Sequence, residues 1–415
     1  MSYKTFAELA DMQKQTLAEK VQYAVEWLRG AFALDGGKAI AFSGGKDSTV
    51  LWHIIRTYFP EARPYIIFGN TGVEYPESLA FARKLGSEWG GERFIEARPS
   101  KTEREGLKYE AQREVMMWLV DTGRIHGVLK ADGKLRNTEA LENMATPEMW
   151  DGFRERNLVW RAGTTKSYWW CVDQYGWPIM GKAACKLDAR RINIDCFLRY
   201  SKSDSADPKL LQYYDLIREV KISQHCCTVL KKKPSQRICE ERGIQVTIMG
   251  IMAAESRRRM ISFCENGPLY QLSSGKYHCH PMGIWTDDDV WQYIRENDVP
   301  YSPLYEMGFT DSKGEFHNIK RNGCFGCCTD IQFPNNHMSM LRRTHPELWQ
   351  LVMEKGMAEQ LQRLRQYRAN GMISIFDTVG SVKEIMDFRP CVFDSIDRLI
   401  VDDDTFTEYD PEEDT

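Results

Sequence analysis

Short apolar runs alternate with helical patterns in two separate parts of the chain. Residues 38–42 (KAIAF) and 65–68 (YIIF) are mostly apolar and predict buried strands, and an apolar pattern with helical spacing follows each of them. Residues 244–250 (IQVTIMG) predict another strand, and residues 286–297 (TDDDVWQYIREN) predict a helix that begins after Thr286. This alternation predicts an α/β fold with a doubly wound, mostly parallel sheet and helices on its faces.

Two long stretches depart from this rhythm. Residues 5–31 have apolar positions near helical spacing and predict a single amphipathic helix before Gly36. Residues 100–215 lose the regular alternation and predict an insertion, in which five of the twelve Trp lie between Trp150 and Trp177. These aromatic side chains either fill a small helical core or form a surface on which bases stack.

The pattern divides the chain into six segments. The region 338–370 is again helical in pattern, and the acidic tail beyond residue 400 is predicted to be disordered. The segments, in order, are an N-terminal helix (1–37), the first part of the α/β core (38–99), the Trp-rich insertion (100–215), the second part of the core with a cysteine site (216–335), a helical C-terminal region (336–400) and the acidic tail (401–415).

Charge is distributed unevenly along the chain. The 415 residues include 55 Lys and Arg against 59 Asp and Glu, but residues 401–415 carry eight acidic residues and no Lys or Arg, so the other 400 residues have a net charge of +4. A mildly basic body is compatible with a nucleotide or nucleic-acid partner. No run approaches the roughly 18 apolar residues that span a bilayer, and the N-terminus does not read as a signal peptide. We therefore expect a cytoplasmic protein whose 12 cysteines are reduced thiols, some of them metal ligands.

The sequence SGGKDST, directly after the predicted strand at 38–42, has the composition of an anion-binding loop. It consists of Ser43, Gly44, Gly45, Lys46, Asp47, Ser48 and Thr49. Glycines let the backbone approach an anion, amides at the start of the next helix bind it, and Lys46 adds a positive charge. The G-x-x-x-x-G-K-[ST] spacing of a Walker A loop is absent, which disfavours a P-loop NTPase. The sequence predicts a phosphate or pyrophosphate site here, the alternative being a plain strand-to-helix turn.

This loop resembles the SGGKDS signature of the PP-loop (ATP-pyrophosphatase) superfamily. The motif GNTGVEYPE, which contains Gly72 and Glu74, is similar to the TG-x-E-x-P-E turn of phosphoadenylyl sulfate (PAPS) and adenylyl sulfate (APS) reductases. The resemblance implies an adenine nucleotide alpha hydrolase-like fold whose loop holds nucleotide phosphates, with Lys46 in a catalytic role. It also implies that Glu74 orients substrate or metal; the alternative is a Glu that only caps a loop.

Cysteines gather at two places, the adjacent pair Cys226-Cys227 and the C-x-x-C of Cys324 and Cys327. Four thiolates from two such halves can surround a [4Fe-4S] cluster or bind zinc, although an adjacent Cys pair is less usual for zinc, and free thiols are the third possibility. The arrangement resembles the cluster-binding subclass of the reductases, which implies that these four are ligands of a [4Fe-4S] cluster. Cys328 is then a spare thiol beside the cluster, either a candidate catalytic nucleophile or a small buried side chain.

A block between the two cysteine halves resembles the family's G-x-R-x-x-E-S-x-x-R segment. Gly250, Glu255 and Arg259 match it, and the resemblance implies that they contact the nucleotide. Met252 stands where the family usually has Arg, which weakens the case for the same anion being bound in the same way. Two further blocks, at 285–294 and 300–305, also match the family, and we interpret their aromatic residues as packing elements.

The C-terminal part of the chain departs from the reductases. Their nucleophilic thiolate lies in an E-C-G-x-H-like tail, whereas the last cysteine here, Cys391, is not followed by Gly and His. Acidic neighbours raise the pKa of a thiol and oppose thiolate formation. Loss of that tail together with a long insertion makes the chain similar to the PP-loop enzymes of DNA phosphorothioation.

The resemblance implies an enzyme that binds PAPS, APS or ATP at the PP-loop. One possibility is reduction of a sulfonucleotide to sulfite by a thiol or persulfide donor protein. The other is ATP-dependent sulfur transfer onto nucleic acid or another acceptor, with Mg²⁺ on the phosphates and Asp47 as a candidate ligand. A non-catalytic nucleotide-binding regulator and a structural zinc protein are the alternatives. We expect no membrane partner, and the sequence indicates no oligomeric state.

Overall fold

The computed structural model describes residues 3–128, 138–179, 223–311, 314–329 and 336–361 of the 415. The chain forms two compact units: the first comprises Met1–Arg98, Lys231–Met307 and Asn318–Gly323, and the second comprises Pro99–Leu230, Gly308–His317 and Cys324–Thr415. The predicted start of the insertion, at residue 100, lies one residue from the observed division. Both cysteine halves were predicted in the second part of the core, but they belong to the second unit.

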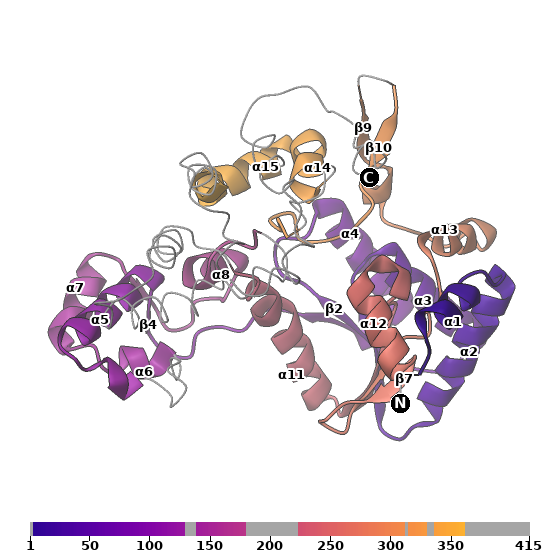
Figure 1. The fold of residues 1–415 in the computed structure, drawn as a ribbon, viewed down its shortest axis with the longest axis horizontal. Helices are drawn as coiled ribbons and strands as arrows, with labels where there is room; N and C mark the ends of the chain where they lie inside the picture. Colours follow the sequence, from indigo (N-terminus) through magenta and orange to yellow (C-terminus); the bar gives the residue numbers. More distant parts are fainter. Residues whose placement is uncertain (1–2, 129–137, 180–222, 312–313, 330–335, 362–415) are drawn as a thin grey trace. The chain divides into compact units, whose positions relative to one another are not determined.

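The first unit is built on a six-stranded sheet (Figure 1). Its strands, in spatial order, are β3 (Phe94–Ala97), β2 (Tyr65–Gly69), β1 (Gly37–Phe42), β6 (Ile244–Met249), β8 (Tyr277–Cys279) and β7 (Leu269–Gln271). All neighbouring pairs are parallel except β7 and β8, which are antiparallel. The predicted α/β fold with a mostly parallel sheet is therefore confirmed.

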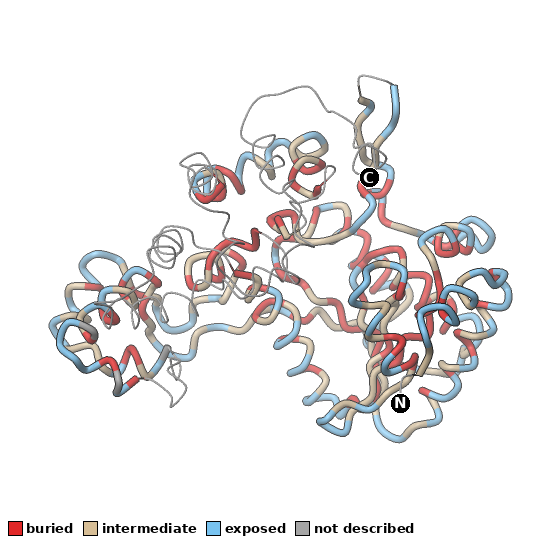
Figure 2. Tube along the Cα trace, in the orientation of Figure 1, coloured by how far each residue is buried: buried red, intermediate tan, exposed pale blue. Residues whose placement is uncertain are grey.

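Alternate residues of the central strand enter two different cores, as expected for a sheet covered on both faces. Ile40 and Phe42 of β1 belong to a large core that includes Leu51 and Ile54 of α3, whereas Ala39 packs in a smaller core with Ile238 of α11. Figure 2 shows this buried interior in red along the strands. The helices of this unit are α1 (Phe6–Met12), α2 (Leu17–Ala33), α3 (Lys46–Tyr58), α4 (Pro76–Leu85), α11 (Lys233–Glu241), α12 (Arg257–Asn266) and α13 (Asp287–Glu296).

The prediction of one N-terminal helix over residues 5–31 is wrong, because the chain begins a second helix at Leu17. Thr16 caps this helix: its side chain accepts a hydrogen bond from the amide of Glu19, and the Glu19 carboxylate accepts one from the amide of Thr16. This capping box has the sequence S/T-x-x-E, which is a start signal that the apolar spacing alone does not reveal. The predicted cap Thr286 of α13 is confirmed and forms the same kind of box with Asp289.

A buried ion pair fixes α13 against α2 inside the first unit. The Nζ of Lys20 lies 2.6 Å from Oδ2 of Asp289, and the Lys20 side chain is 2% exposed. The same Nζ donates to the backbone oxygen of Gln13 at 2.7 Å, so the charge is hydrogen-bonded as well as paired. This pair holds the start of α13, which carries Asp287 into the loop region described below.

The second unit contains the described part of the insertion and the C-terminal helices. Its elements are β4 (Gly106–Leu107), α5 (Tyr109–Asp121), α6 (Thr138–Glu142), α7 (Pro147–Glu155), β5 (Val159–Trp160), α8 (Tyr168–Tyr175), the hairpin β9 (Gly308–Thr310) and β10 (Phe316–Asn318), α14 (His337–Thr344) and α15 (Pro346–Val352). The insertion has its own small core around Leu107, Val115 and Phe153, against which Trp118 and Trp150 pack. This favours the packing interpretation of the aromatic residues.

Across the part of the chain that the structure describes, we find no helix that is both apolar enough and long enough to span a bilayer. The predicted disordered tail and Cys391 lie outside the described residues.

Candidate nucleotide-binding site and cysteine site

The predicted anion-binding loop lies at the point where the order of the sheet reverses. The chain passes from β1 to β2 and β3 on one side and later returns to β6 and β8 on the other, so β1 and β6 are neighbours. Open α/β sheets bind ligands outside the carboxyl ends of the strands at such a switch point. Ser43 follows β1 directly, and Lys46 is the first residue of α3. Gly250 follows β6 at the same edge.

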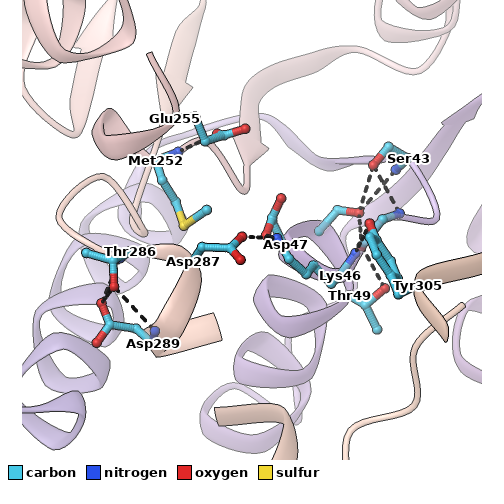
Figure 3. A network of polar contacts seen from close by, with 12 residues as sticks. Ser43, Lys46, Asp47, Thr49, Met252, Glu255, Thr286, Asp287, Asp289 and Tyr305 are labelled. Atoms are coloured by element: carbon cyan, nitrogen blue, oxygen red, sulfur yellow. Dashed lines mark hydrogen bonds and ion pairs between the residues drawn. The ribbon is translucent and has the colours of Figure 1, made fainter. Parts of the chain in front are cut away.

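Hydrogen bonds within the loop fix its conformation (Figure 3). The hydroxyl of Ser43 accepts from the amide of Gly45 at 3.2 Å and lies 3.1 Å from the hydroxyl of Ser48. The hydroxyls of Ser48 and Thr49 both donate to the carbonyl oxygen of Gly45, at 2.9 Å and 3.0 Å. The predicted hydroxyl residues therefore hold the turn at the start of α3, next to the edge where β1 ends.

Three glycines around the loop lie in tight surroundings. Gly44 has a φ of +72°, and a Cβ there would lie 3.0 Å from Cβ of Ala82. A Cβ on Gly45 would lie 3.2 Å from the Tyr305 hydroxyl. At Gly250 a Cβ would lie 2.8 Å from the carbonyl oxygen of Asp47, so the end of β6 touches the loop backbone. The close approach of backbone to backbone is the physical reason for glycine at this position.

Lys46 is the charged centre of the site. Its side chain is 5% exposed, and its Nζ lies 2.8 Å from Oδ1 of Asp47 and 2.5 Å from Oδ1 of Asp287. Burial works against the ammonium charge, but the two carboxylates outweigh it and raise the pKa of Lys46. Figure 3 shows Asp47 and Asp287, from α3 and the start of α13, converging on this side chain. Asp287 lies in the predicted helix of residues 286–297, and sequence analysis assigned it no role at the loop.

Two polar contacts to the loop were missed by sequence analysis. The hydroxyl of Tyr305 accepts a hydrogen bond from the amide of Lys46 at 3.1 Å, and Nδ2 of Asn322 donates to the carbonyl oxygen of Ser43 at 3.1 Å. Burial raises the pKa of Tyr305 to about 12, so the hydroxyl is neutral at ordinary pH. Tyr305 belongs to the block at 300–305, whose aromatic residues were interpreted as packing elements. The aromatic pattern does not show that the hydroxyl of Tyr305 contacts the loop.

Glu74 closes the turn after β2. Its carboxylate accepts from the amide of Thr71 at 3.0 Å, from the Thr71 hydroxyl at 2.6 Å and from the amide of Gly72 at 3.0 Å. Gly72 has a φ of +80°, which suits glycine. These contacts support the capping interpretation, and the role of Glu74 toward a substrate or metal stays a prediction.

The third predicted block forms a small network of opposite charges. Arg259 forms an ion pair with Glu255, whose Oε2 also accepts from the amide of Met252 at 3.1 Å. Arg321 donates to the backbone oxygen of Glu255 at 3.2 Å. Burial and the nearby charge of Arg321 lower the pKa of Arg259. Two guanidinium groups and one carboxylate at this edge leave a surplus of positive charge that suits an anion.

A charged group at the carboxyl end of β3 was also missed. Glu96 lies 2.5 Å from Nε of Arg83 and 2.7 Å from Nη2 of Arg98, and it accepts from Nδ2 of Asn70 at 3.3 Å. Its hydrogen bond from Arg83, aided by Arg98 and Asn70, lowers the pKa of Glu96 to about 2. Asn70 in turn accepts from the amide of Gly72, so Glu96 supports the turn that Glu74 closes.

We predict that Glu96→Gln reduces stability at neutral pH and has little effect in acid. The pKa of Glu96 in the folded chain, about 2, lies below that of a glutamate in an unfolded chain, about 4.3, so the stabilisation is present above about pH 4.5 and is lost as the pH falls toward 2. We expect a loss of about 1 kcal/mol, because the arginine partners are exposed and screened. Urea unfolding of both proteins from pH 7 to pH 3 measures the difference, with the exposed Glu61→Gln as control. A difference that stays constant over this pH range would contradict the prediction.

The predicted cysteine ligands lie together in the second unit. A hydrogen bond with Cys227, then burial, then the charges of Cys327 and Cys324 raise the pKa of Cys226. Burial, followed by the nearby thiol of Cys324, raises the pKa of Cys327 to about 12. The two halves, 98 positions apart in sequence, are therefore close enough for their thiols to act on one another.

A single zinc ion and an iron-sulfur cluster require different spacings of their thiolates. Zinc–sulfur bonds of about 2.3 Å in a tetrahedron place thiolate sulfurs about 3.8 Å apart. Among the described residues, no three thiol sulfurs lie within 4.8 Å of one another; the trio that meets this limit is Asp311, Glu315 and His317 of the β9–β10 hairpin. In a [4Fe-4S] cluster each iron atom binds one cysteine, so the four sulfurs need not meet this limit.

Cys328 is fully buried, and its amide donates to the carbonyl oxygen of Pro178 at 2.9 Å. This supports the interpretation of Cys328 as a small packed side chain. A nucleophilic role for it stays a prediction, because attack on a nucleotide would first require exposure of the sulfur.

An α/β sheet with a glycine-rich, lysine-bearing loop at its switch point is typical of proteins that bind a phosphorylated ligand. The model of the phosphoadenosine phosphosulfate reductase domain matches residues 38–166 and 183–382, which is most of the chain. The chain belongs to the phosphoadenosine phosphosulfate reductase family.

Curated relatives match a shorter part of the chain. A phosphoadenosine 5′-phosphosulfate reductase of Xanthomonas euvesicatoria pv. vesicatoria is 34% identical over 91 residues, which are 22% of this chain and 35% of that protein. The corresponding protein of Xylella fastidiosa is 30% identical over 93 residues, or 37% of its length. The match thus spans about a third of each relative. The crystal structure of a phosphoadenylyl-sulfate reductase from Candida auris in a phosphate complex covers 72% of this chain and 90% of its own, with 12% identity and a TM-score of 0.33.

Proposed function

We propose that this chain is an enzyme that binds an adenine nucleotide at residues 43–49 and carries out sulfur chemistry on or through it. The observation that supports this most directly is the position of Lys46, buried at the switch point of the sheet with Asp47 and Asp287 on its ammonium group. A buried lysine at the first turn of a helix provides charge and amide donors for phosphate oxygens. The phosphoadenosine phosphosulfate reductase family, to which the chain belongs, supports an adenine nucleotide as the ligand.

The first candidate reaction is reduction of a sulfonucleotide to sulfite. A thiolate would attack the sulfur of the transferred sulfonate, the S–O bond to the nucleotide would break, and the nucleotide would leave with that oxygen. A second thiol would then release sulfite and form a disulfide, so the two thiols supply both electrons. The loop and Lys46 would stabilise the charge on the leaving phosphate. Cys328, or a cysteine of a donor protein, is the candidate thiol.

The second candidate is ATP-dependent sulfur transfer, which the pair Asp47 and Asp287 favours. Asp47 and Asp287, which pair with Lys46 in this structure, would hold a Mg²⁺ ion, and the ion would supply positive charge to the nucleotide phosphates. In this reaction an acceptor oxygen attacks the α-phosphorus, pyrophosphate leaves, and a sulfur nucleophile then displaces AMP. The burial of Cys328 also supports sulfur transfer, because sulfonucleotide reduction by Cys328 would need an exposed thiol.

We propose that Cys226, Cys227, Cys324 and Cys327 hold a [4Fe-4S] cluster. The C-x-x-C pattern and the mutual effects of the four thiols support this assignment. When bound, the cluster would supply electron transfer or a site for sulfur.

The expected partners are a thiol or persulfide donor protein and, for the second candidate, a nucleic acid. Exposed basic residues support contact with a phosphate backbone: Lys232 and Lys233 at the start of α11, and Arg257 and Arg258 at the start of α12. A non-catalytic regulator that binds the nucleotide without turnover is the remaining alternative.

The two reactions are separated by their products. The anaerobically reconstituted chain is incubated with PAPS, APS and ATP in parallel, with a dithiol and with or without DNA, and sulfite, pyrophosphate and AMP are measured. Sulfite from either sulfonucleotide supports reduction, whereas pyrophosphate and AMP that depend on DNA support sulfur transfer. Binding without any of these products would contradict an enzymatic role.

A further inference from the structure

The last described part of the Trp-rich insertion contacts the C-x-x-C half of the cysteine site. The hydroxyl of Tyr168, at the start of α8, donates a 2.5 Å hydrogen bond to the carbonyl oxygen of Gly326, which lies between Cys324 and Cys327. Beyond α8, the carbonyl oxygen of Pro178 accepts from the amide of Cys328. Ile179 also forms an isolated parallel β-bridge with Cys328. The insertion thus binds the backbone of this loop from two sides.

The same part of the insertion contacts the other cysteine half. The carbonyl oxygen of Trp177 accepts a hydrogen bond from the amide of Ser223 at 2.9 Å. The ring of Tyr175 lies edge-on to the ring of His225, with centroids 4.4 Å apart. His225 directly precedes Cys226. Residues 168–179, which we name the clamp segment, therefore connect two halves that are far apart in sequence.

The side chain of Tyr168 is buried next to the cysteines. Its side chain is 2% exposed, and the thiols of Cys226, Cys327, Cys324 and Cys328 are all close enough to affect its hydroxyl. A Cβ on Gly326 would lie 2.5 Å from the Tyr168 hydroxyl, so the loop and the ring fit with no space between them. The partner of its hydroxyl is a carbonyl oxygen, which can only accept, so the hydroxyl is the donor.

We propose that the clamp segment is the inner wall of the cysteine site and that Tyr168 is its positioning residue, holding the loop of Cys324 and Cys327 in place through the carbonyl of Gly326. This gives the insertion a function: it orders the thiols for the group they bind. Hydrogen bonds to the groups that carry a metal's ligands orient those ligands and tune the metal site. The role of the clamp segment in ordering cluster ligands rests on the proposed [4Fe-4S] cluster. The effect of the Tyr168 hydrogen bond on the cysteine loop can be tested in protein that holds no cluster.

Tyr168→Phe removes the donor and keeps the ring, so it tests the hydrogen bond rather than the packing. In the reduced chain without metal, alkylation by iodoacetamide is followed by mass spectrometry at each cysteine. We expect alkylation of Cys324 and Cys327 to become about tenfold faster, the factor that corresponds to one buried hydrogen bond. Cys239 of α11 is the internal control and keeps its rate. Tyr293→Phe, which removes the hydroxyl 3.0 Å from Nδ1 of His53, is the matched control variant.

A second measurement follows the reconstituted protein. Iron and sulfide per chain are determined anaerobically, and the absorbance near 400 nm is followed after addition of a chelator. We expect Tyr168→Phe to lose the cluster about tenfold faster than wild type, with Tyr293→Phe unchanged. If wild type binds no iron but the alkylation difference is found, the clamp stands and the proposed cluster fails. Equal alkylation rates in wild type and Tyr168→Phe would overturn the clamp, whatever the iron content.

Discussion

Replacing Lys46 with Gln is expected to weaken nucleotide binding at least 100-fold. The ammonium group is the buried positive charge at the start of α3, and Gln cannot replace its charge toward phosphate oxygens. The loss corresponds to about 3 kcal/mol, which is typical of a charge-assisted contact in a buried site. The substitution also leaves the carboxylates of Asp47 and Asp287 without their shared cation, so their repulsion opposes an anionic ligand further. Titration calorimetry with PAPS, APS and ATP in the presence of Mg²⁺ measures the effect.

The exposed Lys84→Gln on α4 is the matched control for Lys46→Gln, because it removes the same charge from the same unit. It should bind each nucleotide as wild type does. If Lys46→Gln bound as tightly as Lys84→Gln, the phosphates would have to lie elsewhere than the loop of residues 43–49.

Gly250→Ala is expected to destabilise the first unit by about 2 kcal/mol and to weaken nucleotide binding about tenfold or more. The added Cβ would lie 2.8 Å from the carbonyl oxygen of Asp47 and 3.2 Å from the amide of Ser48. Both contacts are to backbone, so the loop itself must move, and such overpacking typically costs about 1 to 3 kcal/mol. Urea unfolding gives the stability, and the same calorimetric titration gives the affinity.

Gly152→Ala in α7 provides the control for Gly250→Ala. A Cβ there meets no atom within 4 Å, and Ala is the better helix former, so stability should stay the same or rise by up to about 1 kcal/mol. Unchanged stability and affinity in Gly250→Ala would show that the end of β6 does not constrain the loop.

The sequence predicted the central part of the fold because local signals there agree with the tertiary structure. Residues 38–42 are apolar, a glycine-rich turn follows, and a helical pattern begins at Lys46, so the strand, loop and helix are visible in order. The same consistency of local and global preference made the cap Thr286 predictable. The N-terminal helix was predicted less well, because apolar spacing continues across the break that the Thr16 capping box creates.

The partners of the loop could not be predicted from the sequence because they come from distant parts of the chain. Tyr305 and Asn322 lie more than 250 positions from the loop, and an aromatic or amide residue in a turn has many possible roles. Asp287 was predicted only as part of a helix, and its ion pair with Lys46 depends on how α13 packs against α3. Only the folded chain shows that these side chains meet.

In the cysteine site, too, the sequence predicted the local pattern but not the contacts with distant residues. The C-x-x-C spacing and the family resemblance predicted which thiols belong together, since metal ligands carry a local pattern. Nothing in the spacing of Tyr168 indicates that its hydroxyl binds the carbonyl of Gly326, 158 positions away. The insertion was therefore recognised as a break in the αβ rhythm, while its contact with the site required the structure.

Hydrogen exchange with mass spectrometry, with and without saturating nucleotide, tests the central claim most directly. The claim is that an adenine nucleotide lies on the loop of residues 43–49, at the edge where β1 and β6 end. It predicts that PAPS, APS or ATP with Mg²⁺ slows exchange in peptides covering 43–49 and 250–259, while peptides of α7 exchange as before. Binding without protection of residues 43–49, or protection only in another part of the chain, would contradict it.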